Sequence, residues 1–377
     1  MRPEGACVGT GMVAGFEYAF PAIRGIQASR EFYVSMCPLR LLPKLFLFNE
    51  DEMVPELRAQ RQLNKARLPE MARYVLENPD DYVFSAITAS VDADVKFEPF
   101  GDDPDSRKMG VLRIPMSARF VLNDGQHRRA AIELAMRENP SIGDESIAVV
   151  FFLDQGLARC QQMFADLNRY AIRPARSLGV LYDHRDDKAL LAKLVVAQAP
   201  VFRDVVEMER TTLAPRSRRL FTLSAIYTAT AALLQNVDLE AAEERAKLAA
   251  EFWETVGSQL PQWAQVQQGK LTAGDVREGF LHTHGVVLQA LGRVGNGLMH
   301  HQTKDWKKQL KNLGTIDWRR SNATLWEGRA MIGGRVSKAQ QNVLLTTNAI
   351  KNHLGLNLTA DETRAEEAFQ RGDRRDG

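Results

Sequence analysis

Two kinds of hydrophobic pattern divide this chain into a part that alternates strands with helices and a part that is helical. Between residues 111 and 168, short apolar runs alternate with segments whose apolar residues recur every three or four positions. Such alternation is typical of α/β or α+β architecture. Beyond about residue 190 the pattern is helical throughout. We therefore predict a mixed domain over 1–187, an α-helical domain over 188–359 and a flexible, charged tail over 360–377.

Periodicity and helix breakers predict individual elements of the first domain. Apolar positions spaced i, i+3, i+4, i+7 and i+8 predict an amphipathic helix from Arg67 to Asn78, which Pro79 ends. Further helices are expected over 127–138 and from Leu157 to Asn168. Residues 17–48 predict one or two strands. Other strands are expected at 84–91, 111–116, 119–122 and 147–153.

Composition excludes several classes of protein. The chain has 377 residues, of which 45% are hydrophobic and 25% charged, as in an ordinary globular protein of two or three domains. It has no run of 18 apolar residues and no apolar stretch at its start, so we expect neither a membrane span nor a secretory signal. The three cysteines (Cys7, Cys37 and Cys160) are far apart, which favours the reducing cytoplasm and predicts no structural metal site.

The segment DGQHRRA, Asp124–Ala130, lies where a predicted strand gives way to a helix. Glycine permits a tight turn there, and the free N–H groups of a helix N-terminus attract anions. Cationic side chains are unfavourable at that end unless an anion neutralises them. The pattern indicates a phosphate site, although an Asp cap followed by surface arginines explains the same residues. The candidate phosphate-binding residues are Gly125, Gln126, His127, Arg128 and Arg129.

A second polar cluster lies in FADLNRYAIRPARS, residues 164–177. Asn168, Arg173 and Arg176 are residue types that coordinate a triphosphate and its metal ion, so ATP with Mg²⁺ is the expected cofactor. A solvated basic loop is the alternative. Hydrolysis would require a carboxylate that orients water or metal, which makes Asp124 and Asp166 the candidate catalytic residues.

Positive charge is concentrated near the C-terminal end. Residues 301–351 contain ten Lys or Arg and three acidic residues, although the whole chain carries a net charge of only +2. A basic segment on an otherwise acidic protein predicts contact with a polyanion such as double-stranded DNA. The candidate DNA contacts are Lys307, Lys308, Lys311, Arg319, Arg320, Arg329, Arg335 and Lys338, and in a second cluster Arg216, Arg218 and Arg219.

Some residues have a structural and a functional interpretation. Trp306 and Trp318 could stack on bases, but in a helical domain we expect them to anchor the core. Cys37 precedes a proline, and a small buried hydrophobe is its expected role, with a functional thiol as the alternative. Gly295–Gly297, Gly-Asn-Gly, predicts a turn.

Several motifs in order resemble the DndB family, from about Phe16 to Leu356. They are RAQRQLNKARLPEMARYVLENPDDYVFSAITASVD (58–92), DGQHR, FADLNRYAIRP and WEGRAMIGGRVSK (326–338). The family comprises DGQHR-domain proteins encoded with bacterial DNA phosphorothioate (sulfur) modification systems. The resemblance implies a DNA-binding transcriptional regulator of the modification gene cluster, acting at the promoter of its own operon. Other sulfur-modification proteins are then expected partners, and symmetric operators would favour a homo-oligomer.

The resemblance also implies that the N-terminal half has a ParB/sulfiredoxin-like fold. In that fold the strand-to-helix turn carries a GERR-type or GCHR-type motif that handles nucleotide phosphates, and Gly125–Arg128 occupy it here. Gln126 stands where sulfiredoxin-like members have their catalytic cysteine, so thiol chemistry is not expected. Asn168 and Arg173 are the nearest match to the ParB-like triphosphate ligands, with different spacing. A ParB-like enzyme that binds or hydrolyses ATP, and acts on DNA or on modification partners, is the alternative function. A pure interaction subunit of a modification complex is the third.

Overall fold

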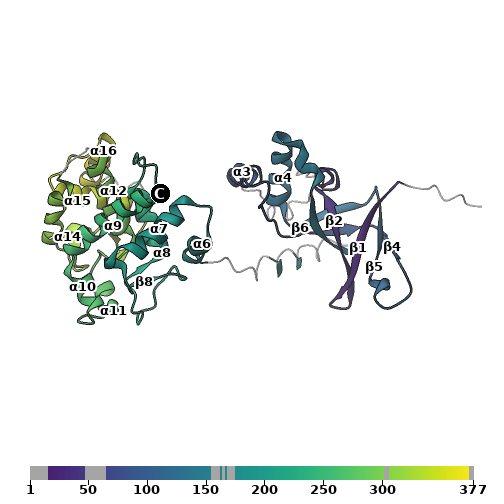
Figure 1. The fold of residues 1–377 in the computed structure, drawn as a ribbon, viewed down its shortest axis with the longest axis horizontal. Helices are drawn as coiled ribbons and strands as arrows, with labels where there is room; N and C mark the ends of the chain where they lie inside the picture. Colours follow the sequence, from purple (N-terminus) through teal and green to yellow (C-terminus); the bar gives the residue numbers. More distant parts are fainter. Residues whose placement is uncertain are drawn as a thin grey trace, which may run out of the picture. The chain divides into compact units, whose positions relative to one another are not determined.

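The chain forms two compact units, Met1–Ile172 and Arg173–Gly377, whose helices and strands are labelled in Figure 1. The computed structural model describes residues 16–46, 65–153, 162–163, 166–167, 175–300 and 305–372. The division lies N-terminal to the predicted boundary at 187. The physical reason is that α6 (Arg176–Tyr182) packs into the helical unit, where Val180 joins the hydrophobic core.

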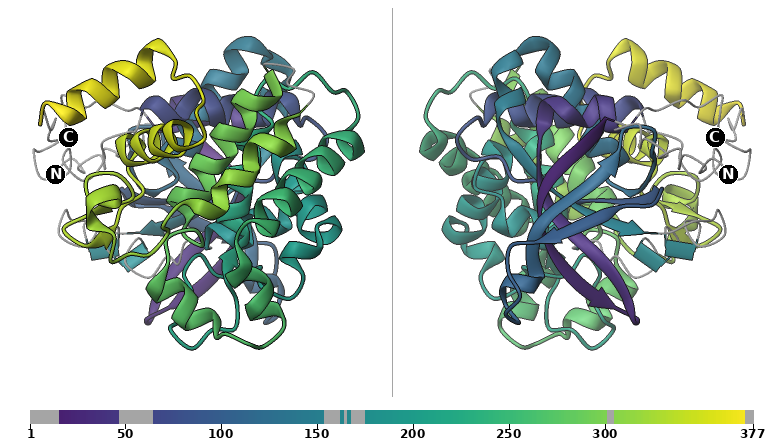
Figure 2. Two further views of the ribbon diagram at one scale, coloured as in Figure 1. Left: turned by 90° about the vertical axis from the view of Figure 1, so that its left-hand side faces the viewer. Right: turned by 90° about the vertical axis from the view of Figure 1, so that its right-hand side faces the viewer.

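The first unit is built on a seven-stranded mixed sheet in the order β4-β5-β1-β2-β7-β3-β6, seen as purple and blue arrows in Figure 2. Neighbouring strands are antiparallel except β3 and β7, which are parallel. A mainly antiparallel sheet with helices makes the fold α+β. The strands are β1 (Glu17–Gln27), β2 (Arg30–Pro38), β3 (Ile87–Asp92), β4 (Lys96–Pro99), β5 (Met109–Pro115), β6 (Arg119–Asp124) and β7 (Ser146–Leu153).

The helices of the first unit follow the predicted periodicity. The predicted helices at 67–78 and 127–138 are confirmed as α3 (Leu68–Glu77) and α4 (Gln126–Glu138), which pack on one another. The strand expected up to residue 48 ends earlier, because Pro43 lies in the first turn of a short helix, α1. The predicted helix from Leu157 to Asn168 lies largely outside the described residues. The remaining helical segments are η1 (Leu39–Leu41), α1 (Leu42–Leu45), η3 (Lys65–Arg67), η4 (Ser106–Lys108) and η5 (Pro140–Asp144).

The second unit is helical, as predicted, but contains two short strand pairs that the sequence did not indicate. The pairs are β8 (Val206–Glu207) with β9 (Phe221–Thr222), and β10 (Met331–Ile332) with β11 (Arg335–Val336). Besides α6, the helices are α7 (Asp187–Gln198), η6 (Pro200–Phe202), α8 (Leu223–Leu233), α9 (Ala242–Ser258), α10 (Pro261–Gln267), α11 (Ala273–Gly279), α12 (Gly285–His300), α13 (Trp306–Gln309), η7 (Leu310–Thr315), α14 (Ala323–Trp326), α15 (Gln340–His353) and α16 (Ala360–Gln370).

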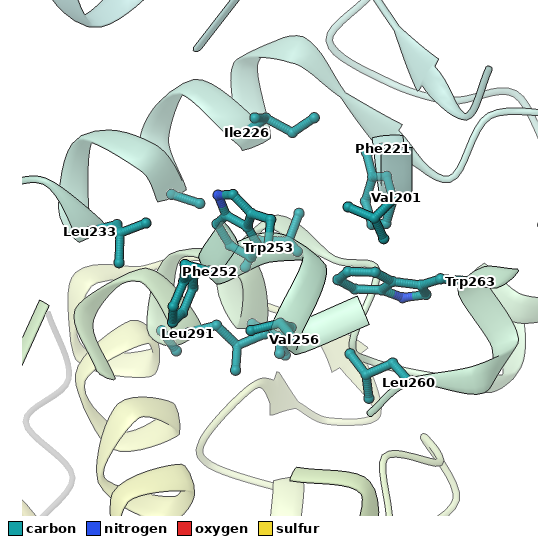
Figure 3. Packing of buried hydrophobic residues seen from close by; sticks show 14 of the residues in the cluster. Val201, Phe221, Ile226, Leu233, Phe252, Trp253, Val256, Leu260, Trp263 and Leu291 are labelled. Atoms are coloured by element: carbon teal, nitrogen blue, oxygen red, sulfur yellow. The ribbon is translucent and has the colours of Figure 1, made fainter. Parts of the chain in front are cut away.

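Aromatic side chains fill the core of the second unit (Figure 3), among them the fully buried Trp253 and Trp263. The prediction that Trp306 and Trp318 are core residues is confirmed: Trp318 is buried and stacks on Trp326, and Trp306 packs against Phe252. Trp306 and Trp318 therefore contribute to the hydrophobic core of the second unit.

Helix α12 runs through the segment in which the sequence predicted a turn. Gly295–Gly297 is helical, and the prediction of a turn there is wrong. The glycines of α12 allow close packing: a Cβ on Gly292 would stand 2.2 Å from the carbonyl oxygen of Ala229 in α8. The need for this contact overrides the low helix propensity of glycine.

The predicted flexible tail is instead a helix over most of its length. Helix α16 begins with a capping box in which Thr359 and Glu362 bond to each other's backbone N–H groups. Glu362 and Glu366 are buried and form ion pairs with Lys351 and Arg329. These partners stabilise a segment whose composition alone offers little to bury.

Candidate functional site

The DGQHR turn has the backbone geometry that the sequence predicts. Gly125 is the N-cap of α4 and adopts a left-handed conformation with φ of +102°, which favours glycine. Because a glycine is the N-cap, α4 has no side-chain cap from that position, and among the described residues the Asp124 side chain accepts no hydrogen bond from the backbone of α4, as the structural interpretation would require. Its carboxylate instead accepts a hydrogen bond from Arg128.

Arg128 is bonded within the protein on three sides. Its guanidinium donates to the hydroxyl of Ser85, to the carbonyl oxygen of Ala86 at 3.0 Å and to the Asp124 carboxylate. Its side chain is 18% exposed. Arg128 therefore ties the start of α4 to the segment before β3, which is a structural role.

The other side chains of the turn are also largely engaged. Gln126 is buried and donates to the carbonyl oxygen of Leu122 at 3.1 Å. Arg129 is buried beside Glu133, and burial lowers its pKa. Burial and the charges of Arg67 and Arg128 lower the pKa of His127, which is thus neutral at pH 7. Several donors of these side chains are thus used within the protein, whereas Arg128 Nε and Arg129 Nε are buried and have no hydrogen-bond partner among the described residues. The turn also presents the backbone N–H groups at the start of α4 to an anion.

Of the remaining nucleotide-site candidates, the structure describes Asp166 and Arg176. Asn168 and Arg173 lie outside the described residues. Asp166 is exposed and accepts a hydrogen bond from Gln162 at 2.8 Å. Arg176 belongs to the second unit, where its guanidinium lies 5.8 Å from the centre of the Tyr227 ring. ATP and Mg²⁺ binding at DGQHR stays a prediction.

We expect Arg128→Ala to lower the free energy of unfolding by about 1.5–3 kcal/mol, because the half-buried acceptors at Ala86 and Asp124 lose a charged donor. Urea unfolding followed by circular dichroism measures the change. Arg137→Ala is the matched control, since Arg137 lies on the same helix with a 71% exposed side chain. Equal stability of the two variants would contradict the structural role of Arg128.

The predicted DNA contacts in the basic segment differ in their surroundings. Lys307 and Lys308 are exposed and pair with Glu251 and Asp305, at 3.1 and 2.9 Å. Such surface pairs are weak, so both ammonium groups remain accessible to another anion. Arg319 pairs likewise with Asp317, and Lys311 and Arg335 are exposed.

Arg329 differs from these residues because it is used inside the protein. Its side chain is 13% exposed, pairs with the buried Glu366 and donates to the carbonyl oxygen of Leu345. The sequence-based expectation of a DNA contact at Arg329 is at odds with this engagement. The sequence did not reveal this internal role of Arg329, because its partner Glu366 lies in the segment that was predicted to be a flexible tail.

The fold brings residues from distant parts of the second unit around one cavity of about 1330 Å³. Three predicted DNA contacts line it, namely Arg216, Arg218 and Arg320, together with Arg277, which the sequence analysis missed. Arg219 is not among the lining residues, and its guanidinium donates to the carbonyl oxygen of Asp204. The cavity thus joins the two basic clusters of the sequence.

Two of the cavity's arginines hold its walls in place. Arg277 donates to the carbonyl oxygens of Ala214 and Pro215 at 2.9 and 2.8 Å, and also to that of Arg219. Arg320 donates to the carbonyl oxygen of Gly334 at 3.1 Å. The bonds of Arg277 fix the loop that carries Arg216 and Arg218, and the bond of Arg320 holds the turn between β10 and β11.

Arg216 and Arg218 themselves are exposed and unpaired. Within the part of the chain that the structure describes, neither side chain has a hydrogen bond or an ion pair. An unpaired guanidinium offers five N–H donors in a geometry that suits phosphate. These two arginines are therefore the groups of the cavity best placed to meet an incoming anion.

The charges around the cavity favour an anion. Among the described residues, four arginines and two carboxylates, Asp275 and Glu278, line it. Burial and the charges of Arg320 and Arg277 lower the pKa of His284, whose Nε2 donates to the carbonyl oxygen of Arg277 at 2.9 Å. Because the histidine is neutral at pH 7, the lining carries an excess of two positive charges.

Sequence signals for the newly found lining residues were weak. Thr283 to Gly285 stand directly before and at the start of α12, in the segment HTHG. His282 and His284 have no third ligand at metal-binding spacing in the sequence, so the segment predicts no zinc site, and nothing in it indicates a cavity wall. Among the described residues, no group of three His, Cys, Asp or Glu side chains is arranged to hold a metal ion.

Cys37 lies in β2 and is completely buried. Burial raises the pKa of its thiol to about 12, so the thiol remains protonated at neutral pH. Both observations favour the structural role over the functional thiol.

No helix in the described ranges is long and apolar enough to cross a membrane. Neither a curated protein nor a solved structure matches the chain. Residues 20–357 match the family described as DndB, DNA-sulfur modification-associated, and this match covers most of the chain. The chain therefore belongs to the DndB family of proteins associated with DNA sulfur modification.

Proposed function

We propose that this protein is a cytoplasmic DNA-binding transcriptional regulator of a DNA phosphorothioate modification gene cluster. The observation that carries the proposal is the pair of exposed arginines, Arg216 and Arg218, which have no partner among the described residues, at a positively charged cavity in a DndB-family chain. Phosphate contacts by such side chains supply affinity for DNA that falls steeply with salt. Base contacts elsewhere would then select the site.

The proposal includes the partners of the protein. The DNA is the promoter region of its own operon, and a homo-oligomer reads it, because operators are commonly symmetric. Other sulfur-modification proteins are further partners. ATP with Mg²⁺ acts as an effector of DNA binding. The ATP-hydrolysing alternative has less support, since the side chains of the DGQHR turn bond to the protein itself.

The test is binding of the purified protein to a duplex from its own upstream region and to an unrelated duplex, across a salt series, with and without ATP–Mg²⁺. We expect tighter binding to the upstream duplex. The double variant Arg216→Ala, Arg218→Ala should weaken binding to both duplexes and reduce the salt slope by about 2, one unit for each lost phosphate contact.

A matched control carries Lys188→Ala and Lys247→Ala, which remove the same charge from exposed positions on α7 and α9 outside the cavity. This variant should bind like the wild type. Equal binding of the two duplexes would reject the regulator. A shallow salt slope would favour an interaction subunit, and an unchanged slope in the arginine variant would place the DNA surface elsewhere.

A further inference from the structure

The residues that line the cavity include a threonine whose buried hydroxyl group has no partner in the described part of the chain. Thr283 lines the cavity and is 5% exposed. Its Oγ1 has no hydrogen-bond partner among the described residues. A buried hydroxyl without a partner is costly, and such groups in native proteins call for a missing partner. A ligand in the cavity would supply that partner.

The N-terminus of α12 lies at the same place. This helix of 16 residues begins at Gly285, which also lines the cavity. The first N–H groups of a helix have no partner inside the helix. In the described part of the chain, no side chain accepts a hydrogen bond from the backbone of Gly285 or Val286. Helix α8 also starts here, but Thr222 caps it.

A lysine approaches this helix start. A Cβ on Gly285 would lie 3.3 Å from Nζ of Lys338, so the ammonium group stands over the first residue of α12. Desolvation of this ammonium and the charge of Arg176 lower the pKa of Lys338. A cation at a helix N-terminus is unfavourable unless an anion lies between them. Charge, free donors and the unused hydroxyl therefore all indicate the same kind of ligand.

We propose that the cavity binds a phosphate group, which accepts hydrogen bonds from Thr283 and from the N-terminus of α12. The lining Arg216 and Arg218, and Lys338 beside Gly285, supply the positive charge that attracts it. The cavity's volume of about 1330 Å³ exceeds that of many small-molecule sites, so it accommodates a nucleotide as well as a lone anion. The same chemistry comes from a free nucleotide or from a DNA strand. If the phosphate belongs to a DNA strand, the inference rests on the proposed function. If it belongs to a free nucleotide, the inference does not depend on that function.

The decisive variant is Thr283→Val, which removes the hydroxyl and keeps the shape. Because this hydroxyl has no partner, the variant should be at least as stable as the wild type. Thr230→Val is the matched control: Thr230 is 1% exposed, also has an unpartnered Oγ1, and does not line the cavity. Any difference in binding between the two variants then reports on the cavity.

Binding is measured by calorimetry with inorganic pyrophosphate and with ATP, and by a salt series with the upstream duplex. We expect Thr283→Val to weaken binding of at least one probe about tenfold, as for loss of a hydrogen bond to a charged group, while Thr230→Val binds like the wild type. An effect on pyrophosphate and ATP identifies a free nucleotide as the source of the phosphate. An effect on the duplex alone identifies a DNA strand.

Two results would overturn the inference. One is wild-type binding of all three probes by Thr283→Val. The other is ATP binding that Arg128→Ala abolishes and Thr283→Val leaves unchanged, which would place the nucleotide at DGQHR. Absence of duplex binding by the wild type, together with ATP binding that depends on Thr283, would reject the proposed regulator while supporting the phosphate site.

Discussion

Arg329→Ala is expected to lower the free energy of unfolding by about 3–5 kcal/mol, because it leaves the Glu366 carboxylate buried without its cation. The two side chains form a bidentate pair with distances of 2.6 and 2.9 Å, and they are only 13% and 7% exposed. Denaturant unfolding followed by tryptophan fluorescence measures the loss. Arg364→Ala is the control on the helix that carries Glu366, since Arg364 forms an exposed pair with Asp361 and its removal should change stability little.

The pair of Arg329 and Glu366 should make the stability of the fold depend on pH. Burial raises the pKa of Glu366, but the hydrogen bonds and charge of Arg329 and the amide of Asn348 outweigh it, and the pKa lies below its ordinary value of 4.5. A carboxyl group with a lowered pKa stabilises the fold above its ordinary pKa and loses this contribution as the pH falls. The wild type should therefore lose stability below pH 4.5 more steeply than the double variant Arg329→Met, Glu366→Leu.

An Arg329→Ala protein as stable as the Arg364→Ala control would contradict the buried pair. So would an acid-unfolding curve of the double variant that follows the wild type. Either result would favour the flexible tail that the composition of this segment suggests over a packed helix α16.

Gly292→Ala is the second change with a large expected effect. The new Cβ would stand 2.2 Å from the carbonyl oxygen of Ala229 and 3.3 Å from the backbone nitrogen of Leu233. Both are backbone atoms of α8, which cannot rotate away as a side chain can, so α8 and α12 must separate. We expect a loss of about 3 kcal/mol, read as a fall in the melting temperature.

Gly297→Ala provides the control on the same helix. Its Cβ would meet only the end of the Lys351 side chain, at 3.9 Å. There the better helix propensity of alanine should raise stability by about 0.5–1 kcal/mol. A melting temperature of Gly292→Ala at or above that of Gly297→Ala would refute the close approach of the two helices.

The sequence predicted elements whose signal is local. The amphipathic spacing of α3 and the strand-turn-helix around Gly125 are both present, because burial of one helix face and a left-handed glycine are imposed by neighbouring residues. Helix α16 and the middle of α12 were misread for the opposite reason. Glu366 is stabilised by Arg329, and the space at Gly292 is required by Ala229, and neither partner is a sequence neighbour.

At the candidate site, too, the sequence predicted local features but not the contacts between distant residues. Runs of basic residues led to Arg216, Arg218 and Arg320, but only the fold reveals that they surround one cavity with Thr283. At DGQHR the turn was predictable, whereas the direction of the Arg128 side chain was not. Its acceptor at Ala86 lies in a different segment, before β3. Side-chain partners of this kind depend on long-range packing.

The order of strands in the first unit has a consequence for its synthesis. Strand β7 alone connects the β4-β5-β1-β2 group to the β3-β6 group. A nascent chain that has not yet released Ser146–Leu153 from the ribosome therefore carries two half-sheets, each with an unpaired edge at β2 or β3. Open edges of this kind recruit other strands. Because β7, which joins the two half-sheets, is the last strand of the unit in the sequence, chaperones that cover sheet edges should increase the yield of folded protein in cells.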